Sequence, residues 1–157
     1  APRSGRSPAR ASPDARAIPA WPASSETTID DKRMKRAGLD YWYLMEYHVY
    51  PDLETFLRQH AGARMFFAST KAPASYHEAQ FQDGDFIFFG CETRGLPENL
   101  LEKVYDRCIR IPMIPEARSL NLANSVAIVL YEAERQLGFN GLEEAGKLHR
   151  LEWEEKR

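Results

Sequence analysis

The sequence has few cysteines, no long apolar run and almost no net charge. Its two cysteines, Cys91 and Cys108, form no CxxC pair, so they indicate neither a disulfide framework nor a zinc site, and a reducing cytoplasm suits them best. No apolar run approaches the roughly 18–20 residues that a membrane-spanning helix needs, and we expect no membrane association. The formal net charge is only −2, so any contact with nucleic acid must use a local basic patch.

The chain does contain enough apolar material for one domain. Of its 157 residues, 43% are hydrophobic, and this share excludes wholesale disorder. Residues 1–29 differ from the rest because they are rich in Pro, Ser, Ala and Arg and show no helical or alternating apolar period. We predict a low-complexity or aberrant arm without a strand over residues 1–29, and a single domain over residues 30–157.

Short apolar runs alternate with segments of helical period after residue 50. The runs predict buried strands over residues 64–69, 85–90 and 108–113. The intervening pattern predicts helices over residues 52–60, 97–104 and 121–138, with shorter helices over residues 30–38 and 141–157. This alternation predicts an α/β domain built on a mostly parallel sheet.

Two predicted turns at strand ends contain glycines and polar residues that core packing alone does not require. The first, Phe-Gly-Cys-Glu-Thr-Arg-Gly-Leu-Pro, contains Gly90 and Gly95 and leads from the second strand into a helix. It is either a simple tight turn, with Glu92 and Arg94 as a solvated pair, or a place where backbone approaches a ligand. The second turn contains the polar residues Ser119, Asn121 and Asn124, for which helix capping is the ordinary interpretation.

Three words of the sequence resemble one known family. The words FGCETRGLP and IPMIPEARSLNLANSVAIVLYEAERQLGF closely resemble motifs two and three of the SPOUT-class RNA 2′-O-methyltransferases. The word DDKRMKRAGLDYW resembles a segment of one branch, the tRNA (cytidine/uridine) 2′-O-methyltransferases that modify the wobble nucleotide. The resemblance covers residues 30 to about 141.

The resemblance implies a particular fold and cofactor. The fold would have helices on both faces of the sheet and a C-terminal trefoil knot, with the N-terminal strand missing. The cofactor would be S-adenosylmethionine, held by Ala68, Gly90, Ile111, Ser119 and Leu120, and the catalytic candidates would be Ser119 and Asn121. We expect a side chain at Gly90 to fill the space where backbone meets cofactor and to resist a positive φ.

One part of the family pattern is absent. In the family, an arginine of motif one, in an Asn-Thr-Gly-Asn word followed by Ile-Arg, usually receives the ribose proton, and residues 1–29 contain no such word. We interpret this region as the result of a frame disruption or replacement upstream of Asp30, and no general base is assigned. Two alternatives stay open: a catalytically impaired domain that still binds cofactor or RNA, and an enzyme that methylates ribosomal RNA.

The resemblance also implies partners. Positive charge that would bind tRNA phosphates is concentrated in Lys32, Arg33, Lys35, Arg36 and Arg94, although a solvated helix face is the simpler interpretation of the first four. Tyr131 would lie in a homodimer interface, with core packing as its alternative. The four histidines have no metal-like spacing, and we expect no metal.

Overall fold

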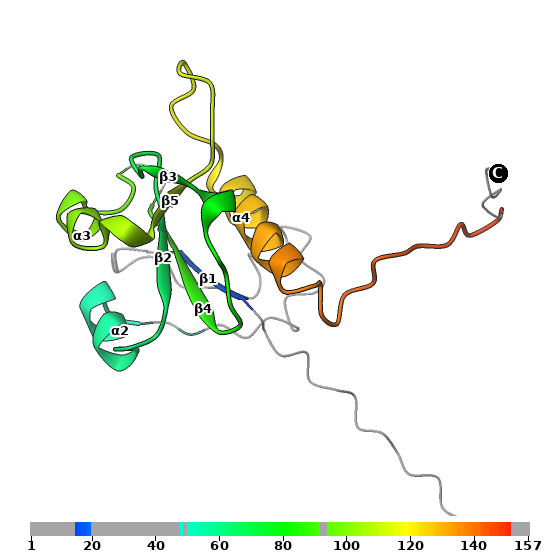
Figure 1. The fold of residues 1–157 in the computed structure, drawn as a ribbon, viewed down its shortest axis with the longest axis horizontal. Helices are drawn as coiled ribbons and strands as arrows, with labels where there is room; N and C mark the ends of the chain where they lie inside the picture. The colour runs from blue at the N-terminus through cyan, green and yellow to red at the C-terminus, as the bar shows by residue number, and fades with distance from the viewer. Residues whose placement is uncertain (1–14, 20–47, 49, 92–93, 152–157) are drawn as a thin grey trace, which may run out of the picture.

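The computed structural model describes residues 15–19, 48, 50–91 and 94–151 (Figure 1). The elements in chain order are β1 (Ala15–Pro19), α2 (Leu53–Gln59), β2 (Met65–Ala68), β3 (Ala74–Ser75), η2 (Tyr76–Glu78), β4 (Asp85–Phe89), α3 (Glu98–Lys103), η3 (Tyr105–Arg107), β5 (Cys108–Arg110) and α4 (Leu122–Gln136). The strands form one sheet in the order β1-β4-β2-β5-β3, and every neighbouring pair is parallel.

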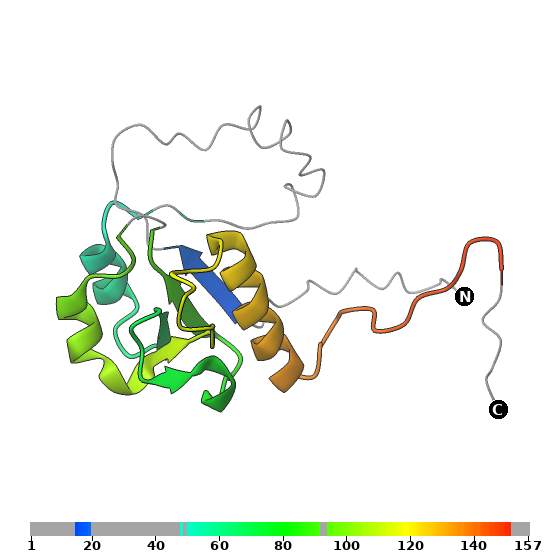
Figure 2. The same ribbon diagram turned by 90° about the horizontal axis from the view of Figure 1, so that it is seen from above.

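Helices cover both faces of this sheet, as Figure 2 shows. The face under α2 and α3 is built from alternate strand residues such as Phe67 and Phe88, which stack with ring centroids 4.9 Å apart. The opposite face contains Ile87 and Phe89 and packs against Val129 of α4. All five residues of β4 are buried, as expected of an inner parallel strand. The predicted α/β class, parallel sheet and two helical layers are confirmed.

A strand lies in the segment where the sequence predicted none. Ala15–Pro19 pairs in parallel with the whole of β4, from Ala15 beside Asp85 to Pro19 beside Phe89. The segment Ala-Arg-Ala-Ile-Pro has no alternating apolar pattern, and it joins the sheet at an edge, where a proline is tolerated. The expectation that residues 1–29 contribute no strand is therefore wrong for Ala15–Pro19.

Other differences concern the ends of elements. The third predicted strand stops at Arg110 instead of residue 113, and β3 was not predicted because it has only two residues. Residues 141–151 contain no helix, although one was predicted over 141–157, and their Leu151 is 75% exposed. A short helix without a docked apolar face is marginal in water, which explains the difference. The helix predicted over residues 30–38 lies outside the described residues.

An ion pair between a buried carboxylate and an exposed arginine closes the amino end of the sheet. Asp85 is 2% exposed and accepts hydrogen bonds from Arg64 Nε at 2.8 Å and from the Gln82 amide at 2.8 Å. Arg64 also donates to the Gln80 carbonyl at 2.6 Å. The buried Asp85 carboxylate is thus paired with a positive charge and with hydrogen-bond donors, and a carboxylate needs such partners when it is buried.

Two features are absent from the described residues. Among the described residues, no helix is long and apolar enough to cross a membrane. In the same part of the chain, no group of three or more His, Cys, Asp or Glu side chains could hold a metal ion.

Candidate functional site

The parallel sheet brings three of the predicted cofactor residues to one edge. Ala68 is the last residue of β2, Gly90 follows β4, and Ile111 follows β5. The Ser69 amide donates to the Ile109 carbonyl at 2.9 Å, which joins the ends of β2 and β5. The carboxyl edge of an open α/β sheet is where such folds bind ligands. The common location of these residues fits the prediction, while their roles remain predictions.

The loop after β4 folds back on itself. The Gly95 amide donates to the Cys91 carbonyl at 2.9 Å, and this turn delivers Leu96, which is 3% exposed, to the core under α3. A Cβ atom on Gly90 would lie 2.2 Å from the Gly95 carbonyl carbon and 2.4 Å from the Leu96 nitrogen. Gly90 is therefore required by its own loop.

This geometry corrects the expectation for Gly90. Its φ is not positive, and a side chain would first meet the returning backbone of the same loop. The glycine that needs a positive φ is Gly95, with φ +67° and nothing within 4 Å of an added Cβ. Two glycines five positions apart were visible in the sequence, but only the folded loop assigns their separate roles.

The loop before α4 carries the two catalytic candidates. Asn121 is the N-cap of α4, and its Oδ1 accepts a hydrogen bond from the Asn124 amide at 3.2 Å. The capping interpretation of Asn121 is thus confirmed, and it leaves the Asn121 side-chain nitrogen without a partner among the described residues. Ser119 and Leu120 are exposed beside it, and Ser119 makes no hydrogen bond within the same part of the chain.

The chemistry of this loop fits an adenosine group. Between residues 112 and 120, the described backbone forms one internal hydrogen bond, from the Ala117 amide to the Ile114 carbonyl at 3.0 Å. Other N–H and C=O groups of the loop therefore remain available to a ligand. Apolar side chains adjoin them, with Ile111 half-buried, Leu120 38% exposed and Ile114 69% exposed. Apolar walls beside free backbone groups are what a purine ring and ribose need.

Two pockets of the described surface lie away from these residues. One, of about 550 Å³, is lined by Gly62, Ala63, Arg64, Met65, Phe66 and Arg107 at the amino end of β2. The other, of about 240 Å³, lies between Ala72 and α3, with the buried thiol of Cys108 in its lining. Neither is lined by Gly90, Ile111, Ser119 or Leu120.

The predicted partner residues are only partly described. Lys32, Arg33, Lys35 and Arg36 lie outside the described residues. Arg94 is exposed on the loop after β4 and forms no ion pair within the described part of the chain. Tyr131 is 62% exposed on α4, so core packing does not explain it.

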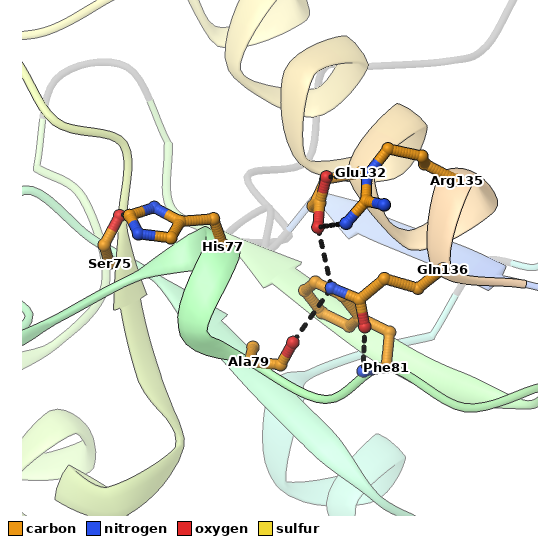
Figure 3. A network of polar contacts seen from close by, with 7 residues as sticks. All are labelled: Ser75, His77, Ala79, Phe81, Glu132, Arg135 and Gln136. Carbon is orange, nitrogen blue, oxygen red and sulfur yellow. Dashed lines mark hydrogen bonds and ion pairs between the residues drawn. The ribbon is translucent and has the colours of Figure 1, made fainter.

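A polar anchor that the sequence did not reveal holds α4 in place (Figure 3). The Gln136 side chain accepts from the Phe81 amide at 2.9 Å and donates to the Ala79 carbonyl at 3.0 Å. Glu132 accepts hydrogen bonds from Arg135 and Gln136, each at 2.8 Å, and the Arg135 bond is the main cause that lowers the pKa of Glu132 to about 2. Because Gln136 lies 55 residues from Phe81 and 57 residues from Ala79, no local pattern could predict these two contacts.

The chain is similar to known proteins of one family. The model of the SpoU rRNA methylase family matches residues 20–131. The chain belongs to this family. A tRNA (cytidine(34)-2′-O)-methyltransferase of Aeromonas hydrophila is 47% identical over 113 residues, which cover 71% of this chain and 72% of that protein. Membership of the family confirms the resemblance stated from the sequence motifs.

Solved structures of the family are also similar. A structure described as giving insight into the 2′-OH methylation of C/U34 on tRNA is 41% identical, with a TM-score of 0.66, and covers 73% of this chain and 74% of that one. A SpoU methyltransferase from Streptomyces viridochromogenes, solved with the cofactor AdoMet, is 22% identical with a TM-score of 0.61. It covers 80% of this chain and 51% of that one, and it shows the likeness of the fold alone.

Proposed function

We propose that this chain transfers a methyl group from S-adenosylmethionine to the 2′-hydroxyl of the ribose at tRNA position 34. The supporting observation is the 47% identity to a tRNA (cytidine(34)-2′-O)-methyltransferase over more than two thirds of both chains. The similarity to a structure concerned with methylation of C/U34 points to the same nucleotide. The family membership supports RNA methyl transfer in general, and these two relatives support the wobble ribose in particular.

The residues at the carboxyl edge suit this chemistry. When bound, S-adenosylmethionine supplies a methyl group activated by a positively charged sulfur. Ala68, Gly90, Ile111, Ser119 and Leu120 would hold it through apolar contacts and backbone groups, which need no charged side chain. The ribose oxygen would accept this methyl group, the sulfur would be left as a neutral thioether, and the hydroxyl proton would pass to solvent, because no side chain is assigned as the base.

Orientation of the ribose is the main task of the protein in such an in-line displacement. Ser119 and the free side-chain nitrogen of Asn121 are the described polar groups adjoining the cofactor loop, and we assign them to hold the ribose oxygen. The cap holds Asn121 in a fixed position at the start of a helix of 15 residues, so the group it presents is preorganised.

The proposal includes a homodimer and a trefoil knot. Tyr131 exposes 62% of its surface on α4, and a second copy of the chain would cover it. The knot is the fold that the resemblance implies for the C-terminal strands and helix. A cytoplasmic location and a mechanism without metal complete the proposal.

The test compares RNA substrates under one condition. Methyl transfer from labelled S-adenosylmethionine is measured on a tRNA pool and on ribosomal RNA, with S119A and N121A beside the wild type. We expect transfer to tRNA, no transfer to ribosomal RNA, and at least about tenfold slower transfer by both variants, with the cofactor affinity of N121A within about twofold of the wild type. Transfer to ribosomal RNA alone would support the alternative of an enzyme that methylates ribosomal RNA. Cofactor binding without any transfer would support the impaired domain.

A further inference from the structure

The structure leaves one shielded arginine without a partner. Arg110 is half-buried at the end of β5, and its side chain forms no hydrogen bond or ion pair with any residue in the described part of the chain. The comparable Arg64, at the opposite edge, is neutralised by Asp85 and also bonds the Gln80 carbonyl. Shielding a guanidinium from water without a partner is unfavourable, so a free Arg110 indicates an external anion.

The residues level with Arg110 in the sheet are uncharged serines. Ser75 of β3 pairs with Arg110 in the sheet, and Ser69 follows Ala68 at the same level on the other side. The Ser75 hydroxyl and His77 Nδ1 are 2.7 Å apart, side by side in Figure 3. Hydroxyl side chains on the strand positions beside an arginine can add hydrogen bonds to an oxyanion that the guanidinium binds.

Other free cations lie on loops that leave the same edge. Arg94, after β4, and Arg118, before α4, are exposed and have no ion-pair partner within the described residues. Lys71 is different, because it is paired with Glu98. Two acids lie in the sequence of these loops, Glu116 near Arg118 and Glu92 near Arg94, so the three arginines still exceed them by one. The carboxyl edge of the sheet is locally basic although the whole chain is not.

We infer that Arg110 binds a backbone phosphate of the RNA substrate beside the reacting ribose. This inference rests on the proposed function, because it takes the carboxyl edge as the reaction site. The competing anion is the carboxylate of the cofactor. S-adenosylmethionine has a sulfonium and an ammonium against that one carboxylate, so three free arginines would repel it, whereas they suit a polyanion. Arg110 is thus a positioning residue that fixes the RNA register while Ser119 and Asn121 hold the ribose.

The first experiment measures the salt dependence of tRNA binding by fluorescence anisotropy. R110Q is compared with the wild type and with R58Q. Arg58 is an exposed arginine on α2 that donates a 3.4 Å hydrogen bond to the Thr55 hydroxyl. We expect R110Q to reduce the slope of log K against log salt by roughly one, while R58Q leaves it unchanged. S-adenosylmethionine affinity by calorimetry should stay within about twofold for both variants. An unchanged slope for R110Q, or a loss confined to cofactor affinity, would overturn the inference.

A second experiment uses the wild-type chain and so does not depend on a variant folding. Arginines are modified with phenylglyoxal, with and without tRNA or S-adenosylmethionine, and the sites are mapped by peptide mass. We expect tRNA to protect Arg110 and the cofactor alone to leave it reactive. Equal modification of Arg110 with and without tRNA would overturn the inference. Protection of Arg110 by a tRNA that is never methylated at position 34 would support this contact and contradict the proposed function.

Discussion

Replacing Gly90 by Ala tests how the loop after β4 is built. The added Cβ would lie 2.2–2.5 Å from three backbone atoms of Gly95 and Leu96, whereas ordinary contacts are 3.4–4 Å. The returning backbone must therefore move by about 1 Å, and it carries the buried Leu96 with it. We expect G90A to lose at least about 2 kcal/mol of the free energy of unfolding, the middle of the range for overpacked sites.

Two other glycines of the chain provide matched controls. An added Cβ on Gly146 meets nothing within 4 Å at an ordinary φ, so G146A should change the free energy by less than about 0.5 kcal/mol. An added Cβ on Gly95 also meets nothing within 4 Å, but the φ of Gly95 is +67°. G95A should therefore lower the free energy of unfolding by about 1–2 kcal/mol through backbone strain alone. Urea unfolding followed by circular dichroism measures all three variants. A G90A midpoint equal to that of G146A would refute the steric argument.

Three further predictions concern other parts of the fold. D85A should lower the free energy of unfolding by about 2–3 kcal/mol in urea melts, because the carboxylate accepts three charge-assisted or buried hydrogen bonds, and a loss below about 1 kcal/mol would contradict this. The pKa of Glu132 is lowered to about 2 in the fold, so its contribution to stability is complete above about pH 4.5 and is lost as the pH falls toward 2. In acid unfolding, E132Q should not show this loss of stability, and identical acid unfolding profiles of E132Q and the wild type would contradict the prediction. Y131D should be monomeric by light scattering where the wild type and the exposed-surface control Y105D are dimers, and a monomeric wild type would refute the dimer.

The parts of the fold that the sequence predicted are those with strong local patterns. The continuous apolar run of β4 and the helical period of α4 are properties of neighbouring residues, so both were located correctly. β1 could not be found because an edge strand of five residues takes its stability from backbone pairing with β4.

The site was predicted only in outline. Strand ends placed Ala68, Gly90 and Ile111 at one edge because parallel strands share their direction. The steric role of Gly90 required the folded loop, since it depends on how Gly95 returns toward it. The sequence also could not predict that the Arg110 side chain has no partner, because ion pairing depends on which residues the fold brings close to it.

Nucleotide-resolution mass mapping of 2′-O-methylation tests the central claim most directly. A purified tRNA with C or U at position 34 is incubated with the protein and labelled S-adenosylmethionine, beside the same tRNA carrying 2′-deoxyribose at that one position. The account predicts one labelled methyl group on the ribose of nucleotide 34 and none on the deoxy substrate. A methyl group on any other nucleotide, or equal labelling of both substrates, would contradict it.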